Sequence, residues 1–426
     1  MRLVLFVVIL LTVSSAHATL KIDINRGNAS KIKLILVQCT QEDHNKGSII
    51  ANIVAADLAS TGFLDVQPNT EIKCNANASI SNFGTLRDTD NLILSLAVSL
   101  SEDGKLTVKY RAIDTSIRKQ ILGKLLESNA QNHRKVAHSI ADSIYTKLTG
   151  DVGYFNTSIA HTSEIDGKKR LAIMDQDGAN LRFITDGRFL VLTPRFSPDG
   201  SKIVYMSYSK LQGKVFIKDL EKRKDTMVGN FKGVVSAPRF SPDGKSVILA
   251  TSNGANTDIH RVYLHNNVQK KLTVHSAINT SPSYSPDQTR IVFTSDRSGS
   301  PQLYTMNANG ASQKRISFGG GSYTAPVWSP RGDLIAFTTV RNRQFYIGVM
   351  KPDGSGERIL ATGHLVEGPT WAPNGRLIAF TREERSVNGK RSISKIYSID
   401  ITGKNERLLP TKHNASDPSW SDEIEY

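Results

Sequence analysis

The stretch Pro194-Arg195-Phe196-Ser197-Pro198-Asp199-Gly200 is one copy of a phrase, Pro-x-aromatic-Ser/Ala-Pro-x-Gly, that recurs through the second half of the chain. Further copies begin at Pro238, Pro282 (where Gln288 replaces the final Gly), Pro326 and Pro369, and a truncated copy begins at Pro418. The opening prolines are separated by 44, 44, 44, 43 and 49 residues. A fixed period of roughly 40 to 50 residues, with several short strands in each unit, is typical of the blades of a β-propeller.

Each copy of the phrase predicts a turn followed by a buried strand. Ser-Pro-Asp-Gly favours a type I turn, because Ser accepts hydrogen bonds locally, Pro presets φ at the second position and Gly completes the fourth. Short β-branched or aromatic runs then follow, as expected of strands packed between neighbouring sheets. These runs are residues 203–205, 247–250, 291–293, 334–337 and 377–380. A third strand and a more charged fourth strand complete the unit, since a polar outer strand suits a sheet edge.

The two ends of the repeat region complement each other. Residues 157–187 supply three strands but lack the leading Pro-x-aromatic strand, whereas Pro418-Ser419-Trp420 is that strand without its followers. We therefore expect the two segments to share one blade. Five complete units and one shared blade predict a six-bladed all-β propeller closed by the C-terminal strand.

Residues 31–150 lack the repeat and predict a small N-terminal α/β domain. Residues 32–37 read as a strand, and residues 48–59 place apolar side chains on one helical face before Gly62. A hairpin is expected across Asp103-Gly104, and a final helix is expected to end at Gly150. No Gly-rich phosphate loop follows the first strand, so nothing here predicts nucleotide binding.

The N-terminus predicts an exported protein. Arg2, an apolar stretch over residues 3–13 and Ala16-His17-Ala18 form the pattern of a cleaved signal peptide, and the apolar stretch is too short to span a bilayer. The expected organisation is a signal peptide at 1–18, a short mature segment at 19–30, the α/β domain at 31–150 and the propeller at 151–426. We expect a soluble protein outside the cytoplasm.

The cysteine content and the net charge limit the classes of partner that the protein is expected to bind. Cys39 and Cys74 are the only cysteines; in an exported protein an even pair suggests a disulfide, and two buried unpaired cysteines are the alternative. The net charge of +15 would prompt a nucleic-acid hypothesis for a cytosolic chain. Export and the scatter of basic residues along the predicted blade rims argue against it, so we expect acidic partners or anionic envelope polymers and no nucleic acid.

Catalytic motifs are missing from the sequence. It contains no G-x-S-x-G nucleophile elbow, and its propeller histidines fall singly on different predicted blades, whereas metal sites cluster His, Cys and carboxylates. Asp199, Asp243 and Asp287 recur once per blade at a turn, which indicates a structural role. We predict a non-enzymatic protein with no cofactor and no metal. A channel-metal propeller hydrolase or lactonase, with Glu367 as its clearest inward carboxylate, and a peptidoglycan-binding propeller are the alternatives.

The order of signal, small α/β domain and six blades resembles the TolB family, the periplasmic components of the Tol–Pal system of Gram-negative bacteria. The most specific pieces are residues 53–58 (IVAADL) and residues 144–150 (IYTKLTG), because the blade phrase is shared by many propellers. The resemblance implies a periplasmic scaffold that binds the lipoprotein Pal at the propeller mouth and TolA through its N-terminal segment. It implies roles in outer-membrane integrity and constriction during cell division. Other outer-membrane proteins would be further partners, and we expect a monomer that meets the membrane only through its partners.

The resemblance also implies which residues touch these partners. Pal contacts fall on loops just ahead of the Pro-x-aromatic strands, which here are Val234, Val235, Ser236, Ala237, Asn279, Thr280 and Ser281. Ala237 and Thr280 match the family best, whereas the family often has His where Val234 stands. Repeat equivalence adds Thr193, Thr324 and Glu367 to the same ring.

The TolA contacts implied by the family fall within residues 19–30. They are Thr19, Leu20, Lys21, Ile22, Asp23 and Ile24. Because Ile22 and Ile24 alternate with polar residues, the segment could also add as a strand to the sheet of the α/β domain.

Overall fold

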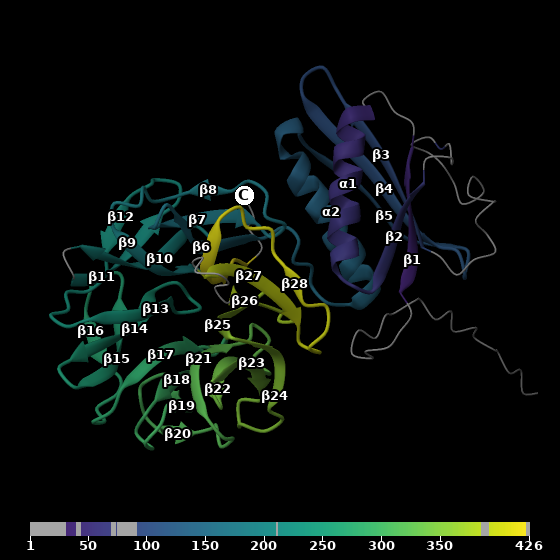
Figure 1. The fold of residues 1–426 in the computed structure, drawn as a ribbon. Helices are drawn as coiled ribbons and strands as arrows, with labels where there is room; N and C mark the ends of the chain where they lie inside the picture. The colour runs from purple at the N-terminus through teal and green to yellow at the C-terminus, as the bar shows by residue number, and fades with distance from the viewer. Residues whose placement is uncertain are drawn as a thin grey trace, which may run out of the picture. The chain divides into compact units, whose positions relative to one another are not determined.

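The computed structural model describes residues 31–39, 44–69, 74, 92–209, 212–384 and 392–422 (Figure 1). The chain divides into two compact units, Met1–Ile140 with Ile144–Gly150, and Ala141–Ser143 with Asp151–Tyr426. The predicted signal peptide and the segment Thr19–Ile24 lie outside the described residues, so both remain predictions. None of the described helices is long and apolar enough to cross a membrane.

The first unit is built on a mixed five-stranded sheet in the order β2-β1-β3-β4-β5. β1 pairs in parallel with β2 and β3, whereas β3, β4 and β5 pair antiparallel. The strands are β1 (Ile32–Gln38), β2 (Leu64–Asn69), β3 (Leu92–Leu100), β4 (Lys105–Asp114) and β5 (Lys119–Asn129). Helices α1 (His44–Ser60) and α2 (His133–Thr149), the latter preceded by the 3-10 turn η2 (Ala130–Asn132), lie on one side of the sheet (Figure 1). The predicted small α/β domain is confirmed.

Helix periodicity explains the core of this unit. Ile50, Val54 and Leu58 recur every fourth residue of α1, on one face, and all three are fully buried. α1 contacts α2 through a buried pair, in which Asp57 Oδ2 lies 2.6 Å from His138 Nδ1. α2 ends as predicted at Gly150, whose φ of 79° is left-handed and whose N–H donates to the Thr146 carbonyl.

The two cysteines of the first unit form a disulfide. Cys39, just beyond β1, is joined to Cys74, 35 residues later. Both are buried among apolar side chains of the sheet, including Ile35, Val37 and Ile93. Of the two arrangements that the sequence left open, the structure therefore has the bonded one.

The second unit is a six-bladed propeller, each blade an antiparallel sheet of four strands. From the innermost strand outward, blade 1 is β9 (Leu190–Phe196), β10 (Lys202–Ser209), β11 (Gln212–Asp219) and β12 (Asp225–Met227). Blade 2 is β13 (Val235–Phe240), β14 (Ser246–Asn253), β15 (Asn256–Tyr263) and β16 (Gln269–Lys271). Blade 3 is β17 (Asn279–Tyr284), β18 (Arg290–Ser295), β19 (Gln302–Asn307) and β20 (Lys314–Arg315).

The remaining blades follow the same plan, and the last one joins the two ends of the propeller. Blade 4 is β21 (Ser322–Trp328), β22 (Ile335–Arg341), β23 (Gln344–Met350) and β24 (Arg358–Gly363). Blade 5 is β25 (Leu365–Trp371), β26 (Leu377–Glu384), β27 (Ile393–Asp400) and β28 (Arg407–Leu408). Blade 6 is β29 (Asn414–Trp420), β6 (Ser158–Ile165), β7 (Lys168–Asp175) and β8 (Arg182–Phe183). The predicted six-bladed ring with a shared blade is confirmed.

The shared blade is closed by backbone and side-chain bonds together. β29 pairs antiparallel with β6, from Asn414 opposite Glu164 to Trp420 opposite Ile159. The Trp420 side chain is buried, and its indole N–H donates to Thr157 Oγ1 over 2.8 Å. The C-terminal strand therefore fixes the first strands of the propeller in place.

The repeated aspartates serve the turns, as the sequence predicted. In blade 1 the Gly200 N–H donates to the Ser197 carbonyl, and Asp199 Oδ1 accepts hydrogen bonds from Ser197 Oγ and from the Ser201 N–H. Asp243 and Asp287 repeat this pattern. Hydrogen bonds from Ser285 and Thr289 keep the pKa of Asp287 below its usual value, since they stabilise the carboxylate.

Candidate protein-binding face of the propeller

A backbone irregularity recurs before each opening proline. The preceding residue has a positive φ in all six copies, and the pairing of the innermost strand with its neighbour shifts register there in every blade. These residues are Thr193 (50°), Ala237 (49°), Ser281 (52°), Ala325 (50°), Gly368 (64°) and Asp417 (55°). Proline cannot donate to a strand ladder, so a β-bulge is the expected consequence at this point. We call the channel opening that these six residues surround the entry mouth.

Five of the six bulge residues are not glycine. A left-handed conformation costs a non-glycine residue about 1 kcal/mol or more, so the surrounding sheet must impose it. The strand ladder does so from both sides, because Ser236 pairs with Ala250 before the bulge and Arg239 pairs with Ile248 after it. The entry mouth is therefore built on a rigid frame.

The predicted Pal-contacting residues lie at this mouth, but the prediction that they occupy loops is wrong for all but Val234. The others lie within innermost strands, at or ahead of the middle of each strand, because the ladder begins two or three residues ahead of the bulge. They are Val235, Ser236 and Ala237 in β13, Asn279, Thr280 and Ser281 in β17, Thr193 in β9, Thr324 in β21 and Glu367 in β25.

Burial separates these residues into two groups. Val235 and Asn279 are 2% and 0% exposed, and the Asn279 side chain donates to the Thr257 carbonyl and accepts from Arg297. Their side chains serve the fold and have no surface to offer a partner. The accessible or half-buried residues are Thr193, Val234, Ser236, Ala237, Thr280, Ser281, Thr324 and Glu367.

Sequence reasoning missed a set of exposed apolar side chains beside this ring. They lie in or next to the loops that lead from the outer strand of one blade to the innermost strand of the next, at four successive positions around the ring. We name them the apolar arc: Phe189, Leu190, Val234, Val274, Ile278 and Phe318. Val274 and Phe318 are 84% and 70% exposed. An isolated apolar residue in a polar loop gives no periodic signal, but its recurrence just before successive copies of the phrase could have revealed the arc.

Acidic groups occupy the other part of the entry mouth. Glu367 precedes the bulge of blade 5, and Asp417 is the bulge residue of blade 6. The protein groups packed around Glu367, followed by the negative charges of Asp417 and Glu383, raise its pKa, against the opposing effect of Lys169. The mouth is thus apolar along blades 1 to 4 and acidic at blades 5 and 6.

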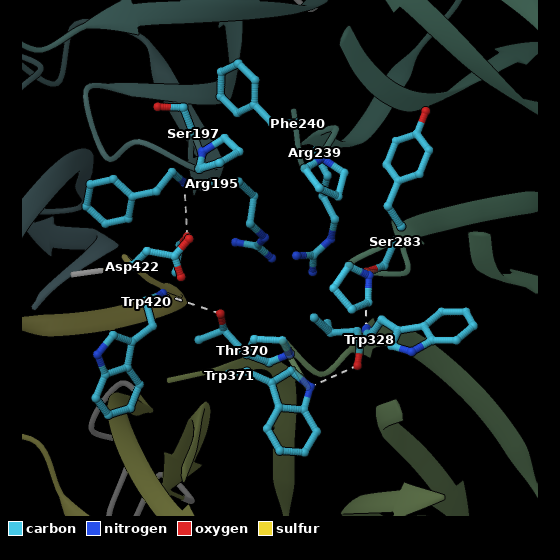
Figure 2. A pocket seen from close by; sticks show the side chains of 18 of the residues that line it. Arg195, Ser197, Arg239, Phe240, Ser283, Trp328, Thr370, Trp371, Trp420 and Asp422 are labelled. Atoms are coloured by element: carbon cyan, nitrogen blue, oxygen red, sulfur yellow. Dashed lines mark hydrogen bonds between the residues drawn. The ribbon is translucent and has the colours of Figure 1, made fainter. Parts of the chain in front are cut away.

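The opposite end of the channel, ringed by the Ser-Pro-Asp-Gly turns, holds a cavity of about 400 Å³ (Figure 2). We call it the turn mouth. The second residue of each phrase lines it: Arg195, Arg239, Ser283, Val327, Thr370 and Ser419. Trp328, Trp371 and Trp420 lie at the periphery of the view in Figure 2. Among the described lining residues there is one carboxylate, Asp422, and no histidine, so the cavity does not supply the ligand cluster that a metal hydrolase needs.

Comparison with known proteins gives consistent matches. The model of the TolB amino-terminal domain matches residues 20–121, and the model of the TolB beta propeller domain matches residues 145–424. A Tol-Pal system protein TolB from Paramagnetospirillum magneticum is 52% identical over 419 residues, which cover 95% of this chain and 93% of that protein. A protein of the same name from Anaplasma marginale is 42% identical over 249 residues, covering 55% of this chain and 56% of that protein. The crystal structure of TolB from Acinetobacter baumannii has a TM-score of 0.82 at 26% identity, covering 92% of this chain and 97% of that one.

Proposed function

The chain belongs to the TolB family of Tol–Pal system proteins, and on that premise we propose that it is a non-enzymatic periplasmic scaffold. The entry mouth of the propeller binds the periplasmic domain of Pal, and the N-terminal segment binds TolA. In this proposal residues 1–18 are a cleaved signal, residues 19–30 are the TolA-binding segment, and residues 31–150 and 151–426 are the two domains.

The apolar arc is the observation that carries the Pal assignment. Its six side chains are 43–84% exposed and come from four successive points on one face of the ring. Soluble monomers rarely leave large contiguous apolar patches in water, and such patches with polar surroundings mark interaction sites. A partner that covers the arc would remove these apolar side chains from water, and this burial would contribute favourably to the free energy of binding.

The ring inside the arc suits the same partner. Ala237 and Thr280, on adjacent blades, are small and half-buried, so they leave room for a partner segment to enter the mouth. Because the bulges are held by strand pairing on both sides, little ordering cost remains to be met on binding. Thr193, Ser236, Ser281 and Thr324 extend this small, polar floor, and Glu367 adds a negative charge at its acidic side.

For TolA we propose recognition by strand addition. Thr19, Leu20, Lys21, Ile22, Asp23 and Ile24 form the contacting stretch. The described sheet of the first unit ends in β2 and β5, whose outer edges lack a strand neighbour. A segment that can pair with such an edge can instead pair with the sheet of a partner, which gives a docked and a released state.

The two contacts together connect TolA at the inner membrane with Pal at the outer membrane. We propose that the protein acts there as a monomer in outer-membrane integrity and in constriction during cell division. Other outer-membrane proteins are candidate partners at the remaining propeller surface, and no nucleic acid is involved.

Calorimetry tests the Pal assignment. The mature chain (residues 19–426) is titrated with the soluble domain of Pal from the same organism, and one-to-one binding is expected. Arginine at both Ala237 and Thr280 should weaken binding at least 100-fold, because bulky charges then fill the floor of the mouth. Ser312→Arg is the control, since it puts the same side chain at an exposed, positive-φ position on an outer hairpin. No binding by the wild type, or equal binding by all variants, would refute the assignment.

Deleting residues 19–24 tests the TolA assignment. The truncated chain should lose binding to the periplasmic domain of TolA and keep its affinity for Pal. Loss of both, or of neither, would contradict the division of labour between the two parts of the chain.

A further inference from the structure

Two arginines are concentrated at the turn mouth. The second residue of each of the six phrases lines this cavity. Blades 1 and 2 supply Arg195 and Arg239 at this position, whereas the other four blades supply only small or branched uncharged side chains. Figure 2 shows the two guanidinium groups directed toward each other in the middle of the cavity. Two like charges from adjacent blades therefore face uncharged side chains at the equivalent positions of the other four blades, and Asp422 is the one carboxylate among the described lining residues.

The two arginines differ in how they are held. Arg195 Nη1 donates to the Pro194 carbonyl over 2.6 Å and to the Pro418 carbonyl over 3.4 Å, and the charge of Asp417 acts on it. The guanidinium group of Arg239 has no hydrogen-bond or ion-pair partner among the described residues, although its backbone pairs with Ile248 in the strand ladder. Burial, followed by the positive charge of Arg195, lowers the pKa of Arg239 well below its usual value. Arg239 is half-buried, and a positive charge that faces a second positive charge without a counter-charge between them favours the binding of a negative partner.

The carboxylate that lines the cavity does not fill this role. Among the described residues Asp422 forms no ion pair with Arg195 or Arg239, and burial raises the pKa of its carboxyl. The positive charge of the pair is therefore available to a ligand.

The facing wall offers hydrogen-bond donors. Ser283, Thr370 and Ser419 each accept a backbone N–H from the neighbouring blade through their hydroxyl oxygen, from Trp328 (3.2 Å), Trp420 (3.4 Å) and Phe196 (3.2 Å) respectively. A hydroxyl that accepts in this way still has its own proton to donate. Two guanidinium forks and three hydroxyls thus surround one small space.

We propose that the turn mouth is a binding site for a small oxyanion, a phosphate or carboxylate group held between Arg195 and Arg239. Planar guanidinium groups bind such oxygens bidentately, and a shared anion removes the repulsion between the two arginines. The residues that line the site differ from those named for the proposed Pal contact.

Thermal unfolding of the mature chain (residues 19–426) tests this site. Inorganic phosphate and acetate are titrated from 0.1 to about 20 mM against chloride at matched ionic strength, because a ligand that binds only the folded state raises Tm in a saturable way. All three tryptophans, Trp328, Trp371 and Trp420, lie in the propeller, so their fluorescence reports its unfolding. Saturable stabilisation by either anion supports the site, and the comparison shows which oxyanion class it prefers.

Variants separate binding from general salt effects. Arg239→Gln should weaken phosphate binding at least tenfold and, in chloride alone, should unfold at a higher temperature than the wild type, because an uncompensated charge is gone. Arg239→Lys keeps the charge without the fork and should weaken binding at least threefold. Arg223→Gln, an exposed arginine in the turn between β11 and β12, should bind like the wild type. An equal phosphate response in wild type and Arg239→Gln, or no response beyond chloride in the wild type, would overturn the proposal.

Discussion

His161 should make the propeller sensitive to mild acid. It lies in β6 of the shared blade with 1% of its side chain exposed, and its Nδ1 has no hydrogen-bond partner among the described residues. Burial lowers its pKa from 6.5 to about 4, against a smaller opposing effect of a backbone hydrogen bond at Ile159. The imidazole is therefore neutral in the folded protein throughout the range in which an unfolded histidine becomes protonated.

The sign and size of the effect follow from this pKa difference. Between pH 6.5 and 4 the histidine is protonated in the unfolded chain and neutral in the folded chain. The contribution of His161 to the free energy of unfolding is therefore fully present above pH 6.5 and is lost as the pH is lowered. At about 1.4 kcal/mol per pH unit, the loss amounts to roughly 3 kcal/mol by pH 4.

Urea unfolding followed by tryptophan fluorescence measures this loss. The free energies of unfolding are compared at pH 7.5, 6.5, 5.5 and 4.5 for the wild type, His161→Gln and the control His265→Gln, which changes an exposed histidine in blade 2. Other groups also titrate, so the difference between the curves is the informative quantity. The stability of His161→Gln should fall by about 2 kcal/mol less than that of the wild type between pH 6.5 and 4.5, while His265→Gln follows the wild type. Parallel curves for wild type and His161→Gln would refute the reasoning.

Three further changes have defined expected outcomes. Trp420→Ala should destabilise the propeller by about 3–5 kcal/mol, because it removes a buried indole and its bond to the last blade, and a urea midpoint near that of the wild type would contradict the closure. Glu367→Gln should raise Tm at pH 7, because the pKa of Glu367 is raised in the folded protein and its ionised carboxyl therefore destabilises the folded state above the unfolded pKa. This gain in Tm should vanish below pH 4, where the carboxyl is protonated in both states. A gain that does not depend on pH would exclude the charge as its cause. Replacing Cys39 and Cys74 by serine should cost the first unit roughly 4 kcal/mol in unfolding monitored by circular dichroism, for a loop of 35 residues, with the tryptophan-monitored transition of the propeller as the internal control that should not move.

The sequence was sufficient to predict the propeller fold, because the turns and strands of each blade are specified by residues that are close together in the chain. Ser-Pro-Asp-Gly specifies a turn wherever it stands, and its spacing counts the blades without any long-range contact. The truncated copy at Pro418 likewise implied ring closure, since an unpaired innermost strand and a blade lacking one can be completed only by each other. The amphipathic spacing of Ile50, Val54 and Leu58 identified the first helix in the same local way.

The features that shape the two mouths depend on tertiary structure. Nothing in the residue types of Thr193, Ala237 or Ser281 indicates a left-handed backbone, because the strand pairing imposes it. The innermost strands were therefore expected to begin at the proline, whereas they begin several residues before it. The inward direction of Arg195 and Arg239 depends on which face of each innermost strand borders the channel. The pairing of Cys39 with Cys74 required the end of β1 and a distant segment to meet.

Binding of Pal to the apolar arc of the entry mouth is the central part of the proposed function. The most direct measurement is the dissociation constant for the soluble Pal domain of a variant carrying Val274→Asp and Phe318→Asp, beside the control Leu408→Asp. Leu408 is an exposed apolar residue on the outer strand β28 of blade 5, remote from the innermost strands. Interface anchors of this kind contribute about 2 kcal/mol or more each, so the double variant should bind at least 100-fold more weakly while the control binds like the wild type. Equal affinities for all three proteins would show that the arc is not the binding surface.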